Sequence, residues 1–323
     1  MQNVRPGPAS RVATAEPQST VAIRTEELGK RYGKITALAG LTMSIPAGDV
    51  FGFLGPNGAG KTTAVKLLLG LARPTSGEGW VLGAPLSDRA AHRRARRGVG
   101  YLPELFRYQH WLSAREVLRI HCELIGLDRA AWDAEIKDAL GIVGLADRAD
   151  DRVGGYSKGM QQRLGLGVAL LGRPALVLLD EPTSALDPVG RHDVREVIRA
   201  LKARGTTVFL NSHLLTEVEQ VCDRVAIVDQ GRVIQVGTLD ELLTTDAVRV
   251  RATGLDNGAH DALRAFGEFQ PEGEWIVVRG IAADRVPDLV RAIVEHGGRV
   301  YAVEPRHESL EDRFLSLLEK PHA

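Results

Sequence analysis

The sequence has little of the chemistry that marks secreted, membrane-spanning or strongly charged proteins. Its 323 residues include only two cysteines, Cys122 and Cys222, at no disulfide or metal-ligand spacing, which favours a reducing compartment. Lys plus Arg and Asp plus Glu both number 41, so no net charge is available for bulk binding of nucleic acid or anionic lipid. No apolar run approaches the roughly 18 uncharged residues of a membrane span, and the N-terminus lacks the apolar core of a secretory signal. What remains is an ordinary globular composition, 44% hydrophobic and 25% charged, expected to form one large or two modest domains.

One glycine-rich stretch carries a specific chemical pattern. Residues 55–62 read G-P-N-G-A-G-K-T and fit the pattern G-x-x-x-x-G-K-[ST] without a gap. An apolar run at 50–54 predicts a buried strand before it, and residues 63–69 predict a helix after it, which is the context that the motif requires. Backbone N–H groups can then surround a phosphate at the helix N-terminus, while the lysine reaches the β- and γ-phosphates and the next threonine ligates Mg²⁺. A glycine-rich turn alone does not require Gly-Lys-Thr, so the stretch predicts a nucleoside triphosphate site. Its candidate residues are Gly55, Pro56, Asn57, Gly58, Ala59, Gly60, Lys61, Thr62 and Thr63.

A second stretch supplies the acidic partner of this site. Residues 175–182 read A-L-V-L-L-D-E-P, an apolar run that ends in two acids. This pattern is typical of a buried parallel strand with carboxylates at its carboxyl end, where ligands bind in open α/β sheets. Asp180 at that position can hold Mg²⁺, directly or through water. Acidic residues at the end of a strand are weak evidence by themselves. Downstream of the phosphate-binding motif, they indicate that Asp180 belongs to the same nucleotide site.

The order of elements predicts the domain organisation. Residues 1–20 are rich in Pro, Ala, Ser and Thr and are expected to form a disordered tail. From 21 to 245 strands and helices alternate, which predicts a largely parallel sheet with helices on its faces. Within this part, apolar residues at three- and four-residue spacing between 113 and 144 predict a helical subdomain, about 104–172 in all. From 246 to 323, strands near 248–250, 275–278 and 300–303 with helices near Ala262, at 286–296 and at 309–318 predict a small α+β domain.

Four features in a fixed order resemble the ATP-binding subunit of ATP-binding cassette (ABC) transporters. They are the motif at 55–62, Y-S-K-G-M-Q-Q-R at 156–163, the L-L-D-E-P strand end, and N-S-H at 211–213. The resemblance covers roughly residues 21–240. The second segment and E-S-L-E-D-R-F at 308–314 look most like the ABC-2-type exporters, which include multidrug, antibiotic, polysaccharide and sodium-extrusion systems. The resemblance implies an α/β P-loop NTPase fold of the ABC ATPase type, with a parallel-sheet core, antiparallel β elements, a helical subdomain and a small C-terminal α+β domain.

The resemblance also implies residue roles. Ser157 and Gly159 match the signature segment that contacts the γ-phosphate bound to the opposite subunit. Glu181 matches the general base that activates water, and His213 matches the histidine that contacts the γ-phosphate and aligns that water. Residues 184–187 match the loop that signals between subunits. Tyr32 matches the aromatic residue that stacks on adenine.

Three positions depart from the family pattern. Lys158 and Met160 replace a glycine and a glutamine of the signature segment. Glu104 stands where the family usually has the glutamine that touches Mg²⁺ and senses the membrane subunit; a carboxylate can also ligate Mg²⁺. The metal candidates are therefore Thr62, Asp180 and Glu104.

The leading hypothesis is an ATPase subunit of an exporter. Two copies, or one copy and a sister subunit, would close around two ATP molecules and act on a separate membrane permease from the cytoplasmic face. The alternative is a soluble ABC ATPase acting on nucleic acid or ribosomes. Such members usually carry two cassettes or a long coiled coil, and this chain has one P-loop, a modest helical insert and no basic excess. We therefore expect no nucleic-acid partner. The signature segment with its following acids also argues against a P-loop kinase or GTPase.

Overall fold

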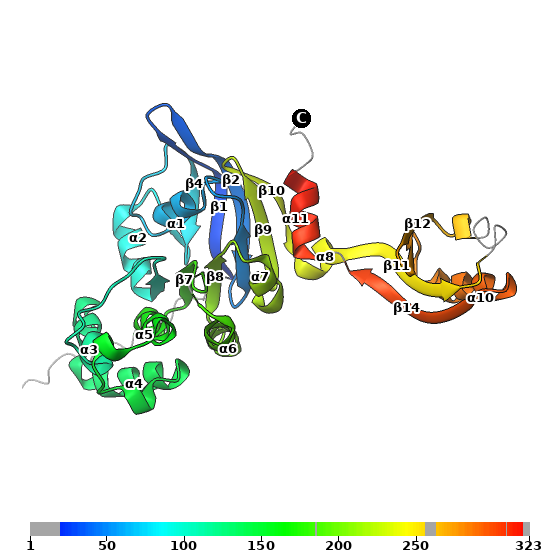
Figure 1. Cartoon of the computed structure of the whole chain (residues 1–323). Coiled ribbons are helices and arrows are strands. Elements are labelled where there is room, and N and C mark those ends of the chain that lie inside the picture. The colour runs from blue at the N-terminus through cyan, green and yellow to red at the C-terminus, as the bar shows by residue number, and fades with distance from the viewer. Residues whose placement is uncertain (1–19, 185, 256–262, 308, 319–323) are drawn as a thin grey trace, which may run out of the picture.

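A six-stranded sheet forms the centre of the chain in this computed structural model, which describes residues 20–184, 186–255, 263–307 and 309–318. The strand order is β10-β9-β3-β8-β7-β6, and all neighbours run parallel except β10, which is antiparallel to β9 (Figure 1). Every residue of β3, β7 and β8 is buried, because helices or strands cover both faces of the sheet. The α/β fold class expected from the sequence is confirmed. The strands are β3 (Val50–Leu54), β6 (Val99–Leu102), β7 (Leu176–Asp180), β8 (Thr207–Asn211), β9 (Arg224–Asp229) and β10 (Arg232–Thr238).

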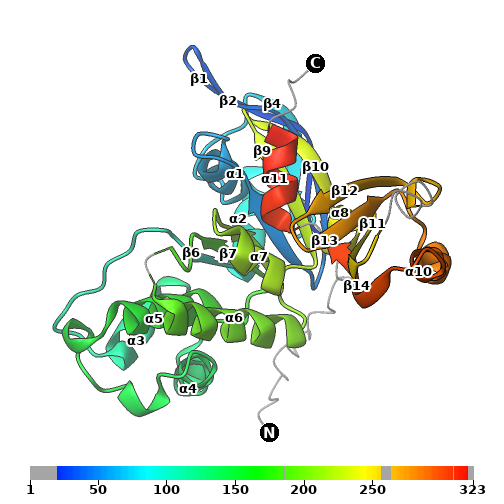
Figure 2. The ribbon, with the colours of Figure 1, turned by 45° about the vertical axis from the view of Figure 1, so that its right-hand side comes forward.

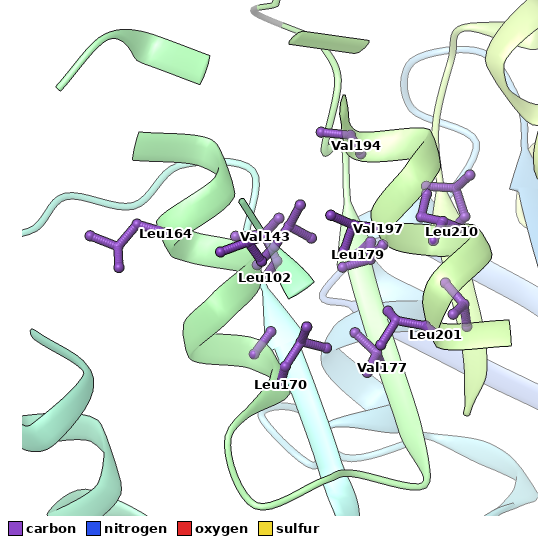
Figure 3. Packing of buried hydrophobic residues seen from close by; sticks show 14 of the residues in the cluster. Leu102, Val143, Leu164, Leu170, Val177, Leu179, Val194, Val197, Leu201 and Leu210 are labelled. Atoms are coloured by element: carbon purple, nitrogen blue, oxygen red, sulfur yellow. The ribbon is translucent and has the colours of Figure 1, made fainter. Parts of the chain in front are cut away.

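The two faces of this sheet pack against different layers. On one face, Phe53 and Phe209 lie with ring centroids 5.2 Å apart beneath α1 and the second sheet. On the other face, leucines and valines of α5 and α6 pack on β7 and β8 (Figure 3). Helix α5 approaches β6 so closely that a Cβ atom on Gly100 would lie 1.9 Å from the carbonyl oxygen of Ala169. The helices of this part are α1 (Lys61–Leu68), α2 (Arg89–Ala95), α5 (Lys158–Leu170), α6 (Pro188–Ala203), α7 (Leu215–Val221) and α8 (Leu239–Leu243).

A four-stranded antiparallel sheet, β2-β1-β4-β5, covers the phenylalanine face. Its strands are β1 (Val21–Tyr32), β2 (Ile35–Pro46), β4 (Ser76–Val81) and β5 (Ala84–Pro85). The strand-like patterns of the sequence at 21–28 and 41–45 cover only part of β1 and β2. The β1–β2 hairpin extends beyond them to the pair Tyr32 and Ile35, across a turn that contains Gly33 with φ 59°. Most residues at the hairpin tip are exposed, whether polar or apolar, so they lack the alternating pattern that reveals a half-buried strand.

The predicted helical region is present and packs beside the sheet. It contains α3 (Ala114–Leu124) and α4 (Trp132–Ile142), which pack with α5. Helix α3 begins with a capping box, in which the Ser113 hydroxyl accepts from the Glu116 N–H and the Glu116 carboxylate accepts from the Ser113 N–H. Short 3₁₀ turns connect the helices of the chain: η1 (Arg96–Gly98), η2 (Arg129–Ala131), η3 (Ala146–Arg148), η4 (Val153–Gly155) and η5 (Ala283–Arg285).

The C-terminal part forms a separate sheet, β12-β13-β11-β14, with α10 packed on one face. Its elements are β11 (Thr244–Thr253), β12 (Glu268–Glu272), β13 (Trp275–Arg279), α10 (Val286–Glu295) and β14 (Arg299–His307). Strand β12 was not predicted, since four of its five residues are Glu, Gln or Pro. The predicted helix near Ala262 and all but Thr20 of the predicted tail lie outside the described residues.

The last helix leaves this C-terminal sheet. Helix α11 (Leu310–Leu318) packs against α7 and α8 of the first domain, beside β9 and β10 (Figure 2). Its Leu310 is fully buried in the same cluster as the sheet and α6. The sequence grouped this helix with the small C-terminal domain, because the chain order places it directly after that domain's last strand. In space it belongs to the core of the first domain.

Candidate functional site

The P-loop joins β3 to α1 at the carboxyl edge of the parallel strands. Gly60 caps α1 with φ 100°, and a Cβ atom there would lie 2.4 Å from the carbonyl oxygen of Ala37, so only glycine fits. Lys61 is 8% exposed and its Nζ donates to the carbonyl oxygens of Gly55 at 2.7 Å and Pro56 at 3.3 Å. Burial lowers the pKa of Lys61, while the carboxylates of Glu181, Asp180 and Glu104 oppose that shift. A buried lysine whose ammonium group donates to backbone carbonyls, beside several acids, can bind an anionic ligand.

Asp180 ends β7 next to the P-loop and is almost fully buried. Its carboxylate accepts a hydrogen bond from the Asn211 side-chain amide at the end of the neighbouring strand β8. Burial raises the pKa of Asp180, and the nearby Glu104 carboxylate raises it further, against the lowering effect of the Asn211 hydrogen bond. In the described part of the chain, the Asn211 Oδ1 atom is buried with no hydrogen-bond partner. This edge of the sheet therefore holds two acids and a buried acceptor.

Glu181 and His213 form a pair beside Asp180. His213 Nδ1 lies 2.7 Å from Glu181 Oε2. The Glu181 side chain is 10% exposed and the His213 side chain 51% exposed, so the pair runs from the interior to the opening. Burial raises the pKa of Glu181, and the His213 contact lowers it in part. Glu181 also has φ 53°, a strained conformation for a residue with a side chain, of the kind that clusters at functional sites.

These side chains line one cavity of about 590 Å³. Its wall is formed by Ile35, Thr36, Ala37, Gly55, Pro56, Asn57, Gly58, Gly60, Lys61, Thr62, Thr63, Glu104, Asp180, Glu181, Asn211, His213 and Phe314. A larger cavity of about 880 Å³ lies near the beginning of strands β7 and β8. It contains mostly small or apolar residues and the ion pairs Arg204–Asp138 and Arg173–Glu135, so its charges are already neutralised. The smaller cavity is the candidate site because it brings together charged side chains with shifted pKa values, although the other cavity has the larger volume.

The predicted metal residues fit a magnesium ion bound together with phosphates. Thr62, Asp180 and Glu104 all line the cavity, and the repulsion between the two carboxylates would be relieved by a divalent cation. Among the described residues, no group of three or more His, Cys, Asp or Glu side chains is placed to hold a metal by itself. A small number of protein ligands is typical of Mg²⁺, which usually binds one or two carboxylates and completes its coordination shell with phosphate and water.

Four predicted nucleotide-binding residues lie elsewhere. Ala59 points into the core beneath the P-loop, and its carbonyl oxygen accepts from the Gly231 N–H at 3.0 Å. Tyr32, at the tip of the β1–β2 hairpin, is 46% exposed, and the Lys30 Nζ lies 4.9 Å from its ring centroid. Ser157 is the N-cap of α5, and its hydroxyl accepts from the Met160 N–H. Neither Ser157 nor Gly159 lines this chain's own cavity.

The loop expected at 184–187 follows the acids directly. The Ser184 hydroxyl donates to the Glu181 carbonyl oxygen at 3.2 Å, and the Asp187 carboxylate accepts from the Gly190 N–H and caps α6. Residue 185 lies outside the described residues. The loop thus connects the strained Glu181 to the start of α6.

Five lining residues were not predicted as site residues: Ile35, Thr36, Ala37, Asn211 and Phe314. Asn211 had a visible signal, because it ends a buried strand in the same way as Asp180 does. Phe314 had none, because it follows the P-loop by some 250 residues and only the docking of α11 brings it to the cavity.

Comparisons with known proteins agree with this geometry. A family model described as ABC transporter matches residues 38–184. An uncharacterized ABC transporter ATP-binding protein of Nostoc sp. is 38% identical over 333 residues, covering 99% of this chain and 96% of that protein. The Nod factor export ATP-binding protein I of Burkholderia orbicola is 39% identical over 303 residues, covering 93% of this chain and 97% of that protein. The solved structure of an ATP binding subunit of an ABC transporter is 31% identical with a TM-score of 0.61, covering 68% of this chain and 91% of that chain.

Proposed function

This chain belongs to the ATP-binding proteins of ABC transporters, and from that premise we propose that it binds Mg²⁺-ATP in the P-loop cavity and powers export through a separate permease. The chain is a transporter ATPase subunit, since the family hydrolyses ATP. The observation that carries the proposal is the meeting of Lys61, Asp180 and the Glu181–His213 pair in one cavity.

Binding of the triphosphate would draw on groups already in position. The Lys61 ammonium exchanges its contacts with backbone carbonyls for phosphate oxygens, and the N–H groups at the start of α1 face the same anion. Thr62, Asp180 and Glu104 would hold Mg²⁺, which neutralises charge on the β- and γ-phosphates. A phosphate anion also stabilises the charged form of Lys61, which burial now disfavours.

Glu181 is the proposed general base. Its carboxylate takes a proton from the attacking water, while His213 holds that carboxylate through the 2.7 Å contact and reaches toward the cavity opening. The raised pKa of Glu181, caused by burial, makes it a stronger base than an exposed glutamate. Because phosphoryl transfer depends mostly on positioning, the strained backbone at Glu181 fits a residue whose direction matters.

The site is proposed to be completed by a second subunit. ABC ATPase subunits dimerise and pair with membrane permeases. Since Ser157 and Gly159 do not line this chain's own cavity, we assign them to the γ-phosphate held by the opposite subunit, which is either a second copy or a sister chain. Tyr32 stays a predicted adenine contact from the hairpin tip.

The permease is proposed to dock on the segment after Glu104. None of the helices within the described ranges is long and apolar enough to cross a membrane. Leu105 and Trp111, 87% and 68% exposed, follow Glu104 before α3 begins. Both lie on one connecting segment, and exposed large apolar side chains of this kind are what protein interaction sites bury. A permease bound there could move Glu104 and so change the metal site, and the chain would work as a peripheral protein on the cytoplasmic face of the membrane.

The proposed domains are the ATPase domain at 21–245, with its helical subdomain at about 104–172, and the accessory domain from 246. We propose that the accessory sheet supports or regulates the dimer. The helix that follows the accessory sheet, α11, is proposed to be part of the ATPase domain, since it packs on α7 and α8.

Purification from detergent-solubilised host membranes tests the transport proposal. Wild-type protein should recover a multi-span membrane protein in stoichiometric amount. A Leu105→Ser/Trp111→Ser variant should lose that partner while keeping its own ATPase activity, because both side chains are exposed. Val294→Ser, at another exposed apolar side chain, on α10, is the matched control and should keep the partner. Recovery with ribosomes or nucleic acid, and without a membrane protein, would contradict the proposal.

A further inference from the structure

Helix α11 brings an aromatic side chain to the nucleotide cavity. Phe314 lines the same cavity as the P-loop and the Glu181–His213 pair, and it is the only Phe, Tyr or Trp side chain to do so among the residues that the structure describes. The helix lies beside β9 and β10, apart from the accessory sheet that precedes it in the chain (Figure 1). A residue near the end of the sequence thus forms part of the wall of a site built near its beginning.

Three contacts fix the position of this helix. Leu310 is fully buried in the core of the ATPase domain. The Leu310 N–H donates to the Glu219 carboxylate of α7 at 3.1 Å, and the Arg313 guanidinium donates to the Gln235 side-chain oxygen of β10 at 3.0 Å. These contacts lie at the helix start and immediately before Phe314. The aromatic ring is therefore held at the cavity by a docked helix.

The lining divides chemically into two kinds of residue. Lys61, the acids and the glycine-rich turn suit a triphosphate with its metal. Ile35, Ala37 and Phe314 are apolar and have no chemistry to offer a phosphate. A nucleotide presents the matching pair of surfaces, because its phosphates are charged and its purine has a flat face on which aromatic rings stack.

We propose that Phe314 contacts the nucleoside end of the bound nucleotide, with its ring against the purine base, so that α11 is part of the ATP site. This inference rests on the proposed ATP site. Tyr32 lies outside the cavity lining, so Phe314 is an additional aromatic contact from the opposite end of the chain. The C-terminal domain and the nucleotide site are then physically connected through β14 and α11.

The inference is tested by comparing ADP with inorganic pyrophosphate, which shares its phosphates but lacks the base. Calorimetric titration should show that Phe314→Ala weakens ADP about tenfold, equal to about 1.4 kcal/mol, and leaves pyrophosphate within about twofold of wild type. Phe314→Leu, which keeps an apolar side chain for packing, should weaken ADP as much as Phe314→Ala. Phe314→Tyr should retain wild-type affinity. Leu315→Ala is the matched control, because Leu315 is 51% exposed on the same helix, and it should bind both ligands normally.

The other outcomes distinguish a failure of the Phe314 base contact from a failure of the ATP site itself. Equal loss of ADP and pyrophosphate affinity would show that α11 only supports the P-loop, and this would overturn the base contact. Wild-type ADP affinity in Phe314→Leu would overturn it as well. If the wild-type chain binds neither ligand, and does not differ from Lys61→Ala, the ATP site itself is refuted. Thermal melting of each variant identifies any that fail to fold, and Phe314→Leu then decides the outcome, since it preserves apolar packing.

Discussion

Replacing Glu181 by glutamine tests the proposed base with almost no change of shape. The amide can still accept a hydrogen bond from His213, so the pair 2.7 Å apart keeps its geometry, but it cannot take a proton from water. General base catalysis contributes about 10²- to 10⁴-fold, so kcat should fall by that factor. ATP affinity should stay within about twofold, since Lys61 and the P-loop are untouched.

The pH dependence provides a second readout. Burial raises the pKa of Glu181 above its ordinary value of 4.5, so wild-type kcat should fall as the pH is lowered through that raised pKa. An acid whose pKa is higher when folded binds more protons in the folded state. Its ionised form therefore costs stability above that pKa, and the cost is relieved as the pH falls through it. Glu181→Gln should accordingly melt at the same temperature as wild type or higher at neutral pH.

The assay is steady-state ATPase turnover with nucleotide affinity and melting measured on the same preparations. Glu196→Gln is the matched control, because Glu196 is an exposed glutamate on α6 whose partner is Arg199. It should keep wild-type turnover. Turnover by Glu181→Gln within threefold of wild type would refute the base assignment. A large drop in the melting temperature of Glu181→Gln would contradict the view that the buried, ionised Glu181 destabilises the folded protein.

Three further substitutions probe the phosphate site, the metal site and the sheet. Lys61→Ala should abolish ATP binding in a titration, because it removes the buried cation that faces the acids, and retained affinity would contradict the P-loop role. Glu104→Gln should raise the Mg²⁺ concentration for half-maximal ATPase activity severalfold, and an unchanged Mg²⁺ dependence would remove Glu104 from the metal site. Gly100→Ala should destabilise the fold by about 1–3 kcal/mol, since the added Cβ meets the Ala169 carbonyl at 1.9 Å. Chemical unfolding measures this loss, and wild-type stability would show that α5 can shift away from β6.

The elements that sequence predicted best are those encoded locally. The strand preceding the P-loop lies at Val50–Leu54, as expected, because it is a continuous apolar run followed by a glycine-rich turn. The strand that ends in Asp180 was equally clear. Parallel strands buried on both faces leave this strong pattern, and their carboxyl ends must meet at one edge. For this reason the sequence alone is enough to assign Lys61 and the two acids to one site.

The parts of the structure that the sequence did not predict depend on tertiary contacts between segments far apart in the chain. The β1–β2 hairpin continues through a largely exposed tip that no hydrophobic period reveals. Strand β12 forms because β13 offers it an edge, although its own residues are poor strand formers. Helix α11 docks on the first domain through the burial of Leu310 and the hydrogen bonds to Glu219 and Gln235, contacts that the order of the chain does not reveal. The place of Phe314 in the cavity follows from that docking.

The central claim is that the P-loop cavity binds ATP and is closed by a second subunit. Light scattering coupled to size-exclusion chromatography, with quantification of bound nucleotide, tests this claim most directly on the Glu181→Gln protein, which should hold ATP without hydrolysing it. If the second subunit is another copy of this chain, Mg²⁺-ATP should produce a dimer carrying two ATP molecules, and the protein without nucleotide should be a monomer. Adding Lys61→Ala should abolish both the nucleotide and the dimer. A monomer with one tightly bound ATP at saturating nucleotide would contradict the closure of this site by another copy of the chain.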